Sequence, residues 1–465
     1  MAMEISSKRR GLIFANVVLA CIATSMLATA MSVALPGVID DFSIDVTLGQ
    51  WVTSGYSLAM AITMPLTAFL ITRFPTKPLY LTGLVTSIAG IALCALAPTF
   101  TVLMVARVLQ AFGNGLLLAM AQVVLLTIYP PEKRGSVMGW YGLSVSAAPV
   151  VAPTIAGLII DAFSWRVIFW AVLPIVVAAL VWALAVFGNV LETHEQRFDV
   201  LSFVLSGIAF AGVTLGVGSI GEGLSLVVAA ELAVGVVAGI AFATRQLRMS
   251  EPFLDVRVFA SRDFSLSVIG SMMLYFVMMG SSTIMPLYVQ SILGESAVAS
   301  AFVMMPGSIA MAVISPFAGR IYDTFGMRPL FIAGAVLLLA SNVGMVSVTA
   351  MTALWVPAAW NALRNVSIGC LMMPLLTWGT ASLPDTQTAH ASALLTSLRT
   401  VAGAVGTAVF VGILNAVAGG TLSADRMVEG MAGLNVTFAC MSVASGALLA
   451  IAVFLVHGRK GRATA

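Results

Sequence analysis

The sequence predicts an all-α polytopic membrane protein, and three observations lead to this fold class. Apolar residues make up 60% of the 465 residues and charged residues only 9%, whereas about 25% charged residues are usual in a soluble domain. The apolar residues form continuous runs of about 20 residues, the length with which an α-helix crosses a bilayer. Gly, Pro, Ser and Thr interrupt these runs without the regular apolar and polar alternation that a β-barrel needs.

Fourteen runs of this kind follow one another along the chain, and each predicts a transmembrane helix. They cover residues 12–36, 49–72, 79–97, 101–127, 137–161, 167–188, 202–219, 225–244, 265–290, 299–322, 330–349, 353–381, 390–418 and 434–457. Twelve spans stay open as an alternative, in which residues 202–244 form a re-entrant pair. Each of the two runs in that region is nevertheless long enough to cross.

The basic residues predict the orientation, because short cytoplasmic connections retain Lys and Arg. An even number of spans places both termini on one side of the membrane. Seventeen of the 22 basic residues fall on that side, Arg166 and Arg426 fall on the other, and Arg107, Arg364 and Arg399 lie within spans. We therefore expect a multi-pass protein of the plasma (inner) membrane with both termini in the cytoplasm.

An internal repeat predicts how the spans are organised. Five identities relate Pro65–Gly83 to Pro316–Gly334 at a constant offset of 251 residues. Such a duplication is typical of transporters built from two related halves. We therefore expect an N-terminal six-helix bundle at 1–190, a linker with two additional spans at 191–264, and a C-terminal six-helix bundle at 265–465.

The two copies of the repeated loop differ in their charged and turn-forming residues. Asp323 has Thr72 as its counterpart, Gly326 has Pro75, and Arg320 has Phe69. Glycines permit tight backbone geometry, and carboxylates and guanidinium groups are suited to ion pairs or to a helix terminus. The second copy is therefore expected to make the stronger contact. A solvated loop that only fixes the topology is the alternative.

Several classes of function lack their usual sequence signals. The four cysteines lie in apolar spans without a CxxC spacing, and the three histidines form no HExxH motif, so we expect neither a metal site nor an enzyme. A phosphate-binding GxxxxGK[ST] loop is also lacking, which argues against ATP as the energy source. The net charge of +3 is expected to face anionic lipid and not nucleic acid.

Seven short segments resemble, in order and spacing, those of the major facilitator superfamily, and specifically its fourteen-span drug/proton antiporters. They are Val33–Pro36, Trp51–Tyr56, Ala106–Gly113, Ala148–Gly157, Ser164–Phe169, Pro286–Gln290 and Ala391–Arg399. The resemblance covers nearly the whole chain. It implies the major facilitator fold and alternating access by two bundles around a central cavity. It also implies proton flow as the energy source, with no cofactor.

The resemblance also implies roles for residues that move or carry protons. Pro149, Pro153 and Gly157 recur every four residues on one helical face, where small residues permit close packing and proline bends the helix. They match the family's antiporter motif, with static packing as the alternative. The family's loop that stabilises the outward-facing state corresponds to Gly319, Arg320, Asp323, Gly326 and Arg328.

Charges inside a membrane are costly and are by default candidates for function. Arg107 matches the family's arginine for proton transfer. Many relatives carry an acid in the first span, where this chain has Ala28. A protonatable carboxylate would then be Asp161, Glu231 or Asp323, with packing or a position near a helix end as the alternative for Glu231. Arg364 and Arg399 either line a polar path or extend toward a helix end.

A central cavity without an acid favours neutral, amphipathic or anionic substrates. Its candidate polar residues are Tyr56, Asn114, Gln122, Tyr141, Tyr275, Gln290, Asn361, Arg364, Asn365 and Arg399. The function predicted is proton-coupled efflux of hydrophobic or amphipathic compounds by a monomer in the lipid bilayer. The alternative is a specific carrier of an organic anion or lipid-like metabolite, and a membrane receptor or sensor without transport is a third possibility.

Overall fold

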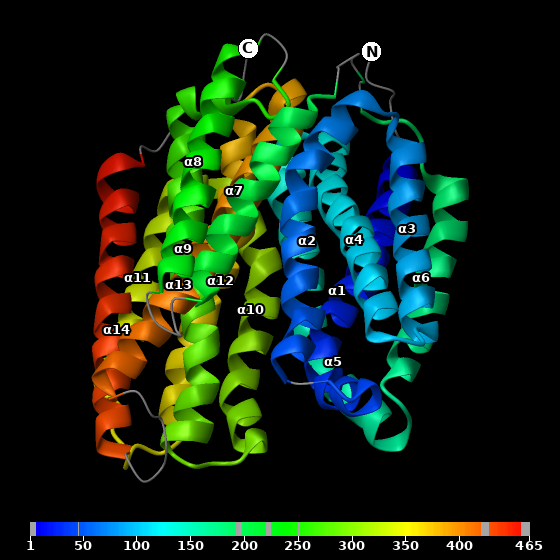
Figure 1. The fold of residues 1–465 in the computed structure, drawn as a ribbon. Coiled ribbons are helices and arrows are strands. Elements are labelled where there is room, and N and C mark those ends of the chain that lie inside the picture. Colours follow the sequence, from blue (N-terminus) through cyan, green and yellow to red (C-terminus); the bar gives the residue numbers. More distant parts are fainter. Residues whose placement is uncertain are drawn as a thin grey trace.

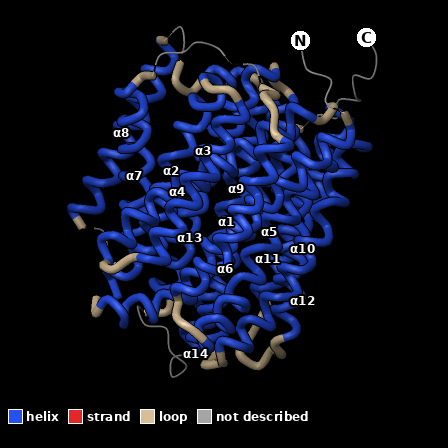
Figure 2. The backbone as a smooth tube through the Cα atoms, turned by 90° about the vertical axis from the view of Figure 1, so that its right-hand side faces the viewer, coloured by secondary structure: helices blue, strands red, loops and turns tan. Residues whose placement is uncertain are grey.

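The computed structural model describes residues 6–44, 46–191, 193, 198–219, 225–249, 252–419 and 427–456. Within these ranges the chain is helical and contains no strand (Figure 2). The long helices are α1 (Ser7–Phe42), α2 (Val46–Arg73), α3 (Thr76–Leu96), α4 (Phe100–Ile128), α5 (Pro131–Ala162), α6 (Arg166–Val186), α7 (Val200–Ser219), α8 (Leu226–Arg248), α9 (Arg262–Pro286), α10 (Ala297–Phe325), α11 (Met327–Val346), α12 (Trp355–Ala381), α13 (Thr388–Val417) and α14 (Met427–Ala450).

Short helical segments complete the described chain. They are the 3₁₀-helices η2 (Val256–Ala260) and η4 (Asp385–Gln387) and the π-helical turns η3 (Leu287–Ile292) and η6 (Ile451–Leu455). Side-chain caps fix several helix starts, because a hydroxyl accepts a hydrogen bond from a free N–H of the first turn. Thr99 caps α4, Ser225 caps α8, and Ser296 caps α10.

Twelve helices in the described ranges are long and apolar enough to cross a membrane. The two long helices outside this set are α5 and α12. The twelve-span alternative instead expected residues 202–244, which form α7 and α8, not to cross, and both of these helices are in the set. Polar residues such as Asn361, Arg364 and Asn365 lower the hydropathy of α12. Its 27 residues, and the 32 of α5, still extend over about 40 and 48 Å.

The helices pack in two groups that follow the order of the sequence. Helices α1–α6 pack on one another and form the right part of Figure 1. Helices α9–α14 likewise pack on one another and form its left part. α7 packs on α8, on α2 of the first group and on α13 of the second. Both chain termini lie at one end of the molecule (Figure 1). We call this end the termini side, and α1–α6 and α9–α14 the first and second halves.

Buried apolar residues form two clusters, and their membership shows where the halves meet. One cluster holds residues of the second half alone, such as Phe331 and Phe438. The other holds the first half together with Phe264, Leu376 and Leu394, which lie near the termini-side ends of α9, α12 and α13. The two halves therefore share a continuous apolar core on the termini side.

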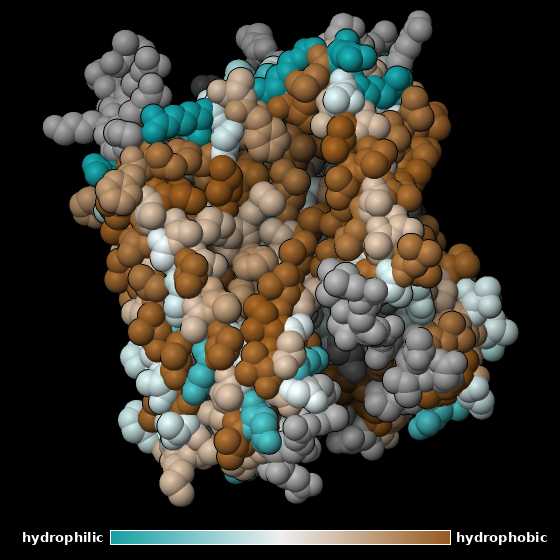
Figure 3. Space-filling model, turned by 60° about the vertical axis from the view of Figure 1, so that its left-hand side comes forward, coloured by the Kyte–Doolittle hydropathy of each residue, from teal (hydrophilic) through white to brown (hydrophobic). Residues whose placement is uncertain are grey.

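The molecular surface agrees with a membrane location. Apolar residues cover the middle of the face shown in Figure 3, and hydrophilic residues gather at the termini side. Large exposed apolar side chains include Val181, Val237 and Val443. Exposure of so many aliphatic side chains would be unfavourable in water and is favourable against lipid tails.

Candidate transport site

Helices α5 and α10 touch closely on the termini side, and glycines make this contact possible. A methyl group on Gly319 would overlap the backbone of Gly135 and Ser136, and one on Gly139 would overlap the carbonyl oxygen of Ser315. Small residues allow such close approach between membrane helices. The contact joins the two halves, since α5 belongs to the first and α10 to the second.

Asp323 adds a charged contact to the same place. Its Oδ1 accepts a hydrogen bond of 2.8 Å from the backbone N–H of Gly135, and its Oδ2 accepts one of 2.6 Å from that of Ser136. Both donors belong to the second turn of α5, just beyond the helix end at which the dipole favours an anion. We call Asp323 with these two donors the second-half latch. The backbone turns directly after it at Gly326, whose φ of 78° suits glycine.

The corresponding loop of the first half is arranged differently. The Thr72 hydroxyl donates to carbonyl oxygens of its own helix, those of Ala68 and Phe69. The Lys77 Nζ donates to the carbonyl oxygen of Leu184 at 2.7 Å, near the end of α6. A cation suits the C-terminal end of a helix. The charge retained in this loop therefore stabilises the first half internally.

Gly157 lies further along α5 with open space beside it. A methyl group there would meet no atom of the described chain within 4 Å, in contrast to Gly135 and Gly139 on the same helix, although the neighbouring Ala152 and Ala156 are buried. The role predicted for Gly157 stays a prediction. Pro149, Pro153 and Asp161 lie in α5, but their side chains are outside the described part, so their predicted roles stay predictions.

Arg107 forms a buried polar group between α4 and α2. Its Nε donates to the carbonyl oxygen of Val52 at 3.1 Å, and its Nη1 donates to Gln110 Oε1 at 2.8 Å. The guanidinium lies 4.1 Å above the ring of Tyr56, whose hydroxyl accepts a hydrogen bond from Asn114. The Nη2 of Arg107 has no partner within the described chain. No described carboxylate balances this buried charge.

A second polar group lies where the two halves face each other. Gln122 of α4 accepts a hydrogen bond from Thr396 of α13 at 3.4 Å. One turn further along α13, the Arg399 guanidinium lies 4.8 Å from the ring centre of Tyr275 in α9. The hydroxyl of Tyr141 in α5 instead donates to Cys21 Sγ of α1 at 4.0 Å. The structure therefore brings together Gln122, Tyr275 and Arg399, three of the residues predicted to line the cavity.

The guanidinium of Arg399 is not fully paired. The residue is only 6% exposed, and its Nε and Nη1 have no hydrogen-bond partner among the described residues. Burial of an unpaired charge is costly, so this group is suited to binding an acceptor that enters the site. Arg107 and Arg399 are both supported by an aromatic ring and both lack an acidic partner in the described chain.

Arg364 lies elsewhere, which corrects the expectation that it lines the cavity. Its Nε donates to Asn342 of α11 at 3.2 Å, and its guanidinium lies 4.9 Å from the ring centre of Phe438 in α14. Asn342 in turn donates to Ser445 at 2.8 Å. The Arg364 side chain therefore points into the second half, between two neighbouring helices, and not toward the first half.

The remaining predicted residues lie in three different places. Asn361 and Asn365 face α10, where a methyl group on Gly307 would contact both amide nitrogens. Gln290 is exposed within η3, and its predicted role in the cavity stays a prediction. Glu231 lies in α8 with its Oε2 buried and without a partner in the described ranges. Arg320 and Arg328 are exposed beside the second-half latch.

Several residues of these groups were not predicted from the sequence. Gln110 follows Arg107 by three residues, so helical periodicity places it on the same face. Thr396 precedes Arg399 by the same interval. Asn342 and Ser445 are isolated polar residues in apolar runs, and this pattern alone could have marked each of them as a buried hydrogen-bonding residue. Their pairing across α11 and α14 required the tertiary structure.

Comparison with protein families places the chain among known transporters. Residues 14–407 match the model of the Major Facilitator Superfamily. The uncharacterized MFS-type transporter YcnB of Bacillus subtilis is 34% identical over 436 residues, which cover 93% of this chain and 91% of that protein. The lincomycin resistance protein LmrB of the same organism is 36% identical over 392 residues, which cover 83% of this chain and 82% of LmrB.

A multidrug resistance protein B homolog of Mycobacterium tuberculosis is 28% identical over 400 residues, 83% of this chain and 74% of that protein. Two solved structures share the fold. The human organic anion transporter MFSD10 (TETRAN) superposes with a TM-score of 0.71 at 13% identity, covering 96% of this chain and all of that chain. FucP in the outward conformation gives a TM-score of 0.63 at 12% identity, covering 94% and 98%.

Proposed function

Since the chain belongs to the major facilitator superfamily and is a membrane transporter rather than an enzyme, we propose that it exports hydrophobic or amphipathic compounds by alternating access. Inward proton flow supplies the energy. The names of the relatives LmrB and multidrug resistance protein B homolog support an export role. In this proposal the substrates are small molecules and the chain acts as a monomer in the bilayer.

The proposed topology has fourteen spans and places the termini side in the cytoplasm of a plasma-membrane protein. The excess of basic residues in the connections on that side supports this orientation. α5 and α12 count as spans in this proposal because their lengths exceed the roughly 30 Å of the hydrocarbon core. Both helices are packed within the bundle, α5 on α1 and α10, and α12 on α10 and α11.

The single observation that carries the proposal is the contrast between the two ends of α5. On the termini side, Gly135 and Gly139 touch α10 and Asp323 binds α5, whereas a methyl group on Gly157 near the other end would meet no described atom within 4 Å. A close contact between the halves at one end of α5, with free space near its other end, fits an outward-facing state. Alternating access then requires the second-half latch to break.

Proton coupling is assigned to Arg107 and a titrating partner. The unpaired Nη2 of Arg107 is an available donor for a substrate or a proton-carrying water. Glu231 and Asp161 remain the proposed carboxylates, and Glu231 has a buried, unpaired oxygen. Protonation removes the cost of such a buried charge.

The test uses purified protein in liposomes with a fluorescent amphipathic substrate and an imposed pH gradient. Export by the unaltered chain should require the gradient and should fall at least tenfold in Arg107→Ala. Arg107→Lys is the matched control, since it retains the charge but loses the guanidinium contacts with Val52 and Gln110. Transport that is equal with and without the gradient would overturn the coupling.

The alternative of an organic-anion carrier has its own supporting observation, the unpaired guanidinium of Arg399 where the halves meet. A carboxylate or sulfonate on the substrate would pair with it. Matched anionic, neutral and cationic fluorophores of one scaffold separate the two functions. Transport of the anion alone, abolished by Arg399→Gln, would favour the specific carrier over broad export.

A further inference from the structure

The segment between α8 and α9, residues 252–260, lies at the termini-side ends of α2 and α13, and we call it the connector. Phe253 of the connector is 1% exposed. Its ring stacks on that of Phe69 in α2, with 5.9 Å between the centroids, and also contacts those of Phe198 and Phe203. Phe69 is the first-half counterpart of Arg320. An aromatic contact therefore occupies the position at which the first loop has Phe69 instead of the arginine of the second.

The next polar residue of the connector contacts the second half. The backbone N–H of Asp255 donates to His390 Nδ1 at 3.3 Å, and its Oδ2 accepts from Gln387 Nε2 at 3.5 Å. Gln387 precedes the first residue of α13, and His390 belongs to its first turn. A carboxylate at this position is favoured by the helix dipole, as Asp323 is at the start of α5.

The internal repeat relates these two carboxylates. The second-half latch uses the N–H groups of Gly135 and Ser136, and the 251-residue offset carries these positions to residues 386 and 387. Asp255 therefore lies beside Gln387, the residue that the offset assigns to Ser136, and its carboxylate binds the Gln387 side chain where that of Asp323 binds backbone N–H groups. The first loop cannot supply a carboxylate there, because Thr72 replaces the acid.

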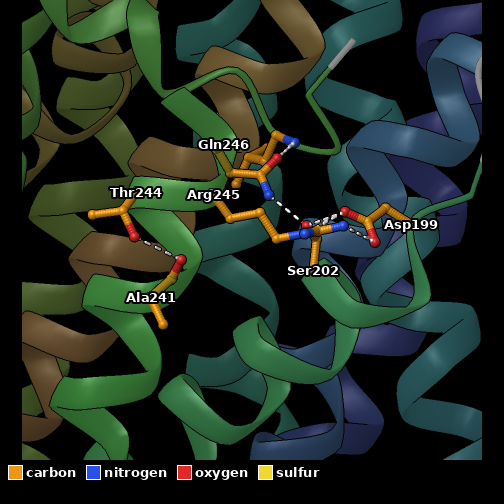
Figure 4. A network of polar contacts seen from close by, with 7 residues as sticks. Asp199, Ser202, Ala241, Thr244, Arg245 and Gln246 are labelled. Carbon is orange, nitrogen blue, oxygen red and sulfur yellow. Dashed lines mark hydrogen bonds and ion pairs between the residues drawn. The ribbon is translucent and has the colours of Figure 1, made fainter. Parts of the chain in front are cut away.

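The ends of α7 and α8 hold the connector in place. Gln246 Oε1 accepts from the backbone N–H of Leu254 at 3.1 Å, and its Nε2 donates to Ser202 at 2.6 Å (Figure 4). Arg245 donates to both oxygens of Asp199 at 2.9 and 3.1 Å. This guanidinium holds the pKa of Asp199 below its usual value. Gln246 of α8 thus fixes the connector, and Ser202 of α7 fixes Gln246.

We infer that Asp255 is a positioning residue that, with Phe253, holds α2 and α13 together on the termini side in place of the lost first-half latch. The inference rests on the proposed alternating access, in which the two halves meet on the termini side and must separate there. They meet in two zones, and each zone has its own closing contact. Asp323 closes the zone between α5 and α10. The connector closes the zone between α2 and α13, and it must release α13 when the termini side opens.

The test measures the two zones separately by electron paramagnetic resonance of spin-labelled full-length protein in nanodiscs. Arg73 and Thr386 are exposed at the ends of α2 and before α13, and Lys133 and Thr324 are exposed at α5 and α10. Labelled cysteines at each pair report one zone, with half-buried Cys440 replaced by Ser throughout. Asp255→Asn is the test variant because its amide oxygen still accepts from the Arg257 N–H, as Asp255 Oδ1 does at 3.0 Å.

The expected result is zone-specific. Asp255→Asn should lower the closed-to-open ratio between α2 and α13 by about two- to fivefold, with no change between α5 and α10. Asp323→Asn should open the zone between α5 and α10 by a larger factor, because it loses two charge-assisted hydrogen bonds, and should leave the zone between α2 and α13 unchanged. Phe253→Leu, which keeps apolar volume but loses the ring contacts, should repeat the effect of Asp255→Asn. If both Asp255→Asn and Phe253→Leu leave the α2 and α13 distances unchanged while Asp323→Asn opens its own zone, this inference fails alone. If substrate and pH open neither zone in the unaltered chain, the proposed function fails.

Discussion

The second-half latch gives the sharpest quantitative prediction. Asp323→Asn removes the negative charge and places an amide NH₂ opposite one of the two backbone N–H groups of Gly135 and Ser136. Hydrogen bonds to a charged acceptor contribute about 1.5–3 kcal/mol each, against about 1 kcal/mol for a neutral one. The variant keeps one neutral bond and loses the other.

Exchanging two charged hydrogen bonds for one neutral bond would cost the closed termini side about 2–5 kcal/mol. We expect the lower part of this range, about 2–3 kcal/mol, because Asp323 is half-buried and water can replace part of the contact. This free energy corresponds to about a thirty- to one-hundred-and-fiftyfold change in the closed-to-open ratio. Spin-label distances between Lys133 and Thr324 measure that ratio, and liposome transport measures its effect on turnover.

Thr72→Ala is the matched control, since the Thr72 hydroxyl donates to carbonyl oxygens within its own helix. It should change the ratio between α5 and α10 by less than about twofold. A closed-to-open ratio that is the same in Asp323→Asn and the unaltered protein would refute the claim that this carboxylate holds the halves together.

Three further predictions concern packing and charge. Gly135→Ala should open the termini side, because its methyl would overlap Tyr322. Gly157→Ala should be neutral or stabilising in the outward-facing state. Spin-label distances and thermal unfolding distinguish the two variants, and equal effects would contradict the contrast along α5. Arg364→Met should leave thermal stability unchanged or higher, since the Nη1 and Nη2 groups of Arg364 are buried without partners in the described chain; a large loss would show that they are paired in the membrane. Asp199→Asn should cost about 1 kcal/mol or less at pH 7. Because the folded-state pKa of Asp199 is lowered, this contribution exists above its unfolded pKa of about 3.9 and disappears as the pH falls through the lower folded value, so melting curves of the two proteins should converge only in strong acid.

Helix positions were largely predictable, because the length of apolar runs is set by the bilayer. The run at 202–219 corresponds to α7 at Val200–Ser219, and that at 330–349 to α11 at Met327–Val346. The start of α5 was misjudged by six residues. It begins at Pro131, a residue that suits the first helical position but that hydropathy does not register.

The polar groups were predictable only in part. Arg107, Tyr56 and Asn114 were singled out as polar residues in apolar spans, and the structure places them together. Arg364 carries the same signal but points between α11 and α14. Hydropathy reports that a residue lies in a span, and the direction of its side chain depends on which neighbours pack against that helix.

The sequence by itself determined that this is a duplicated helical membrane protein with one charged and one altered copy of a loop, because composition, run length and an internal offset are properties of the chain alone. Only the tertiary structure decided how the altered copy is compensated. Phe253 and Asp255 belong to a polar connection with no recognisable motif, and they reach Phe69 and α13 because the inserted helices fold back between the halves. Contacts between residues so distant along the chain are fixed by packing, which local sequence does not encode.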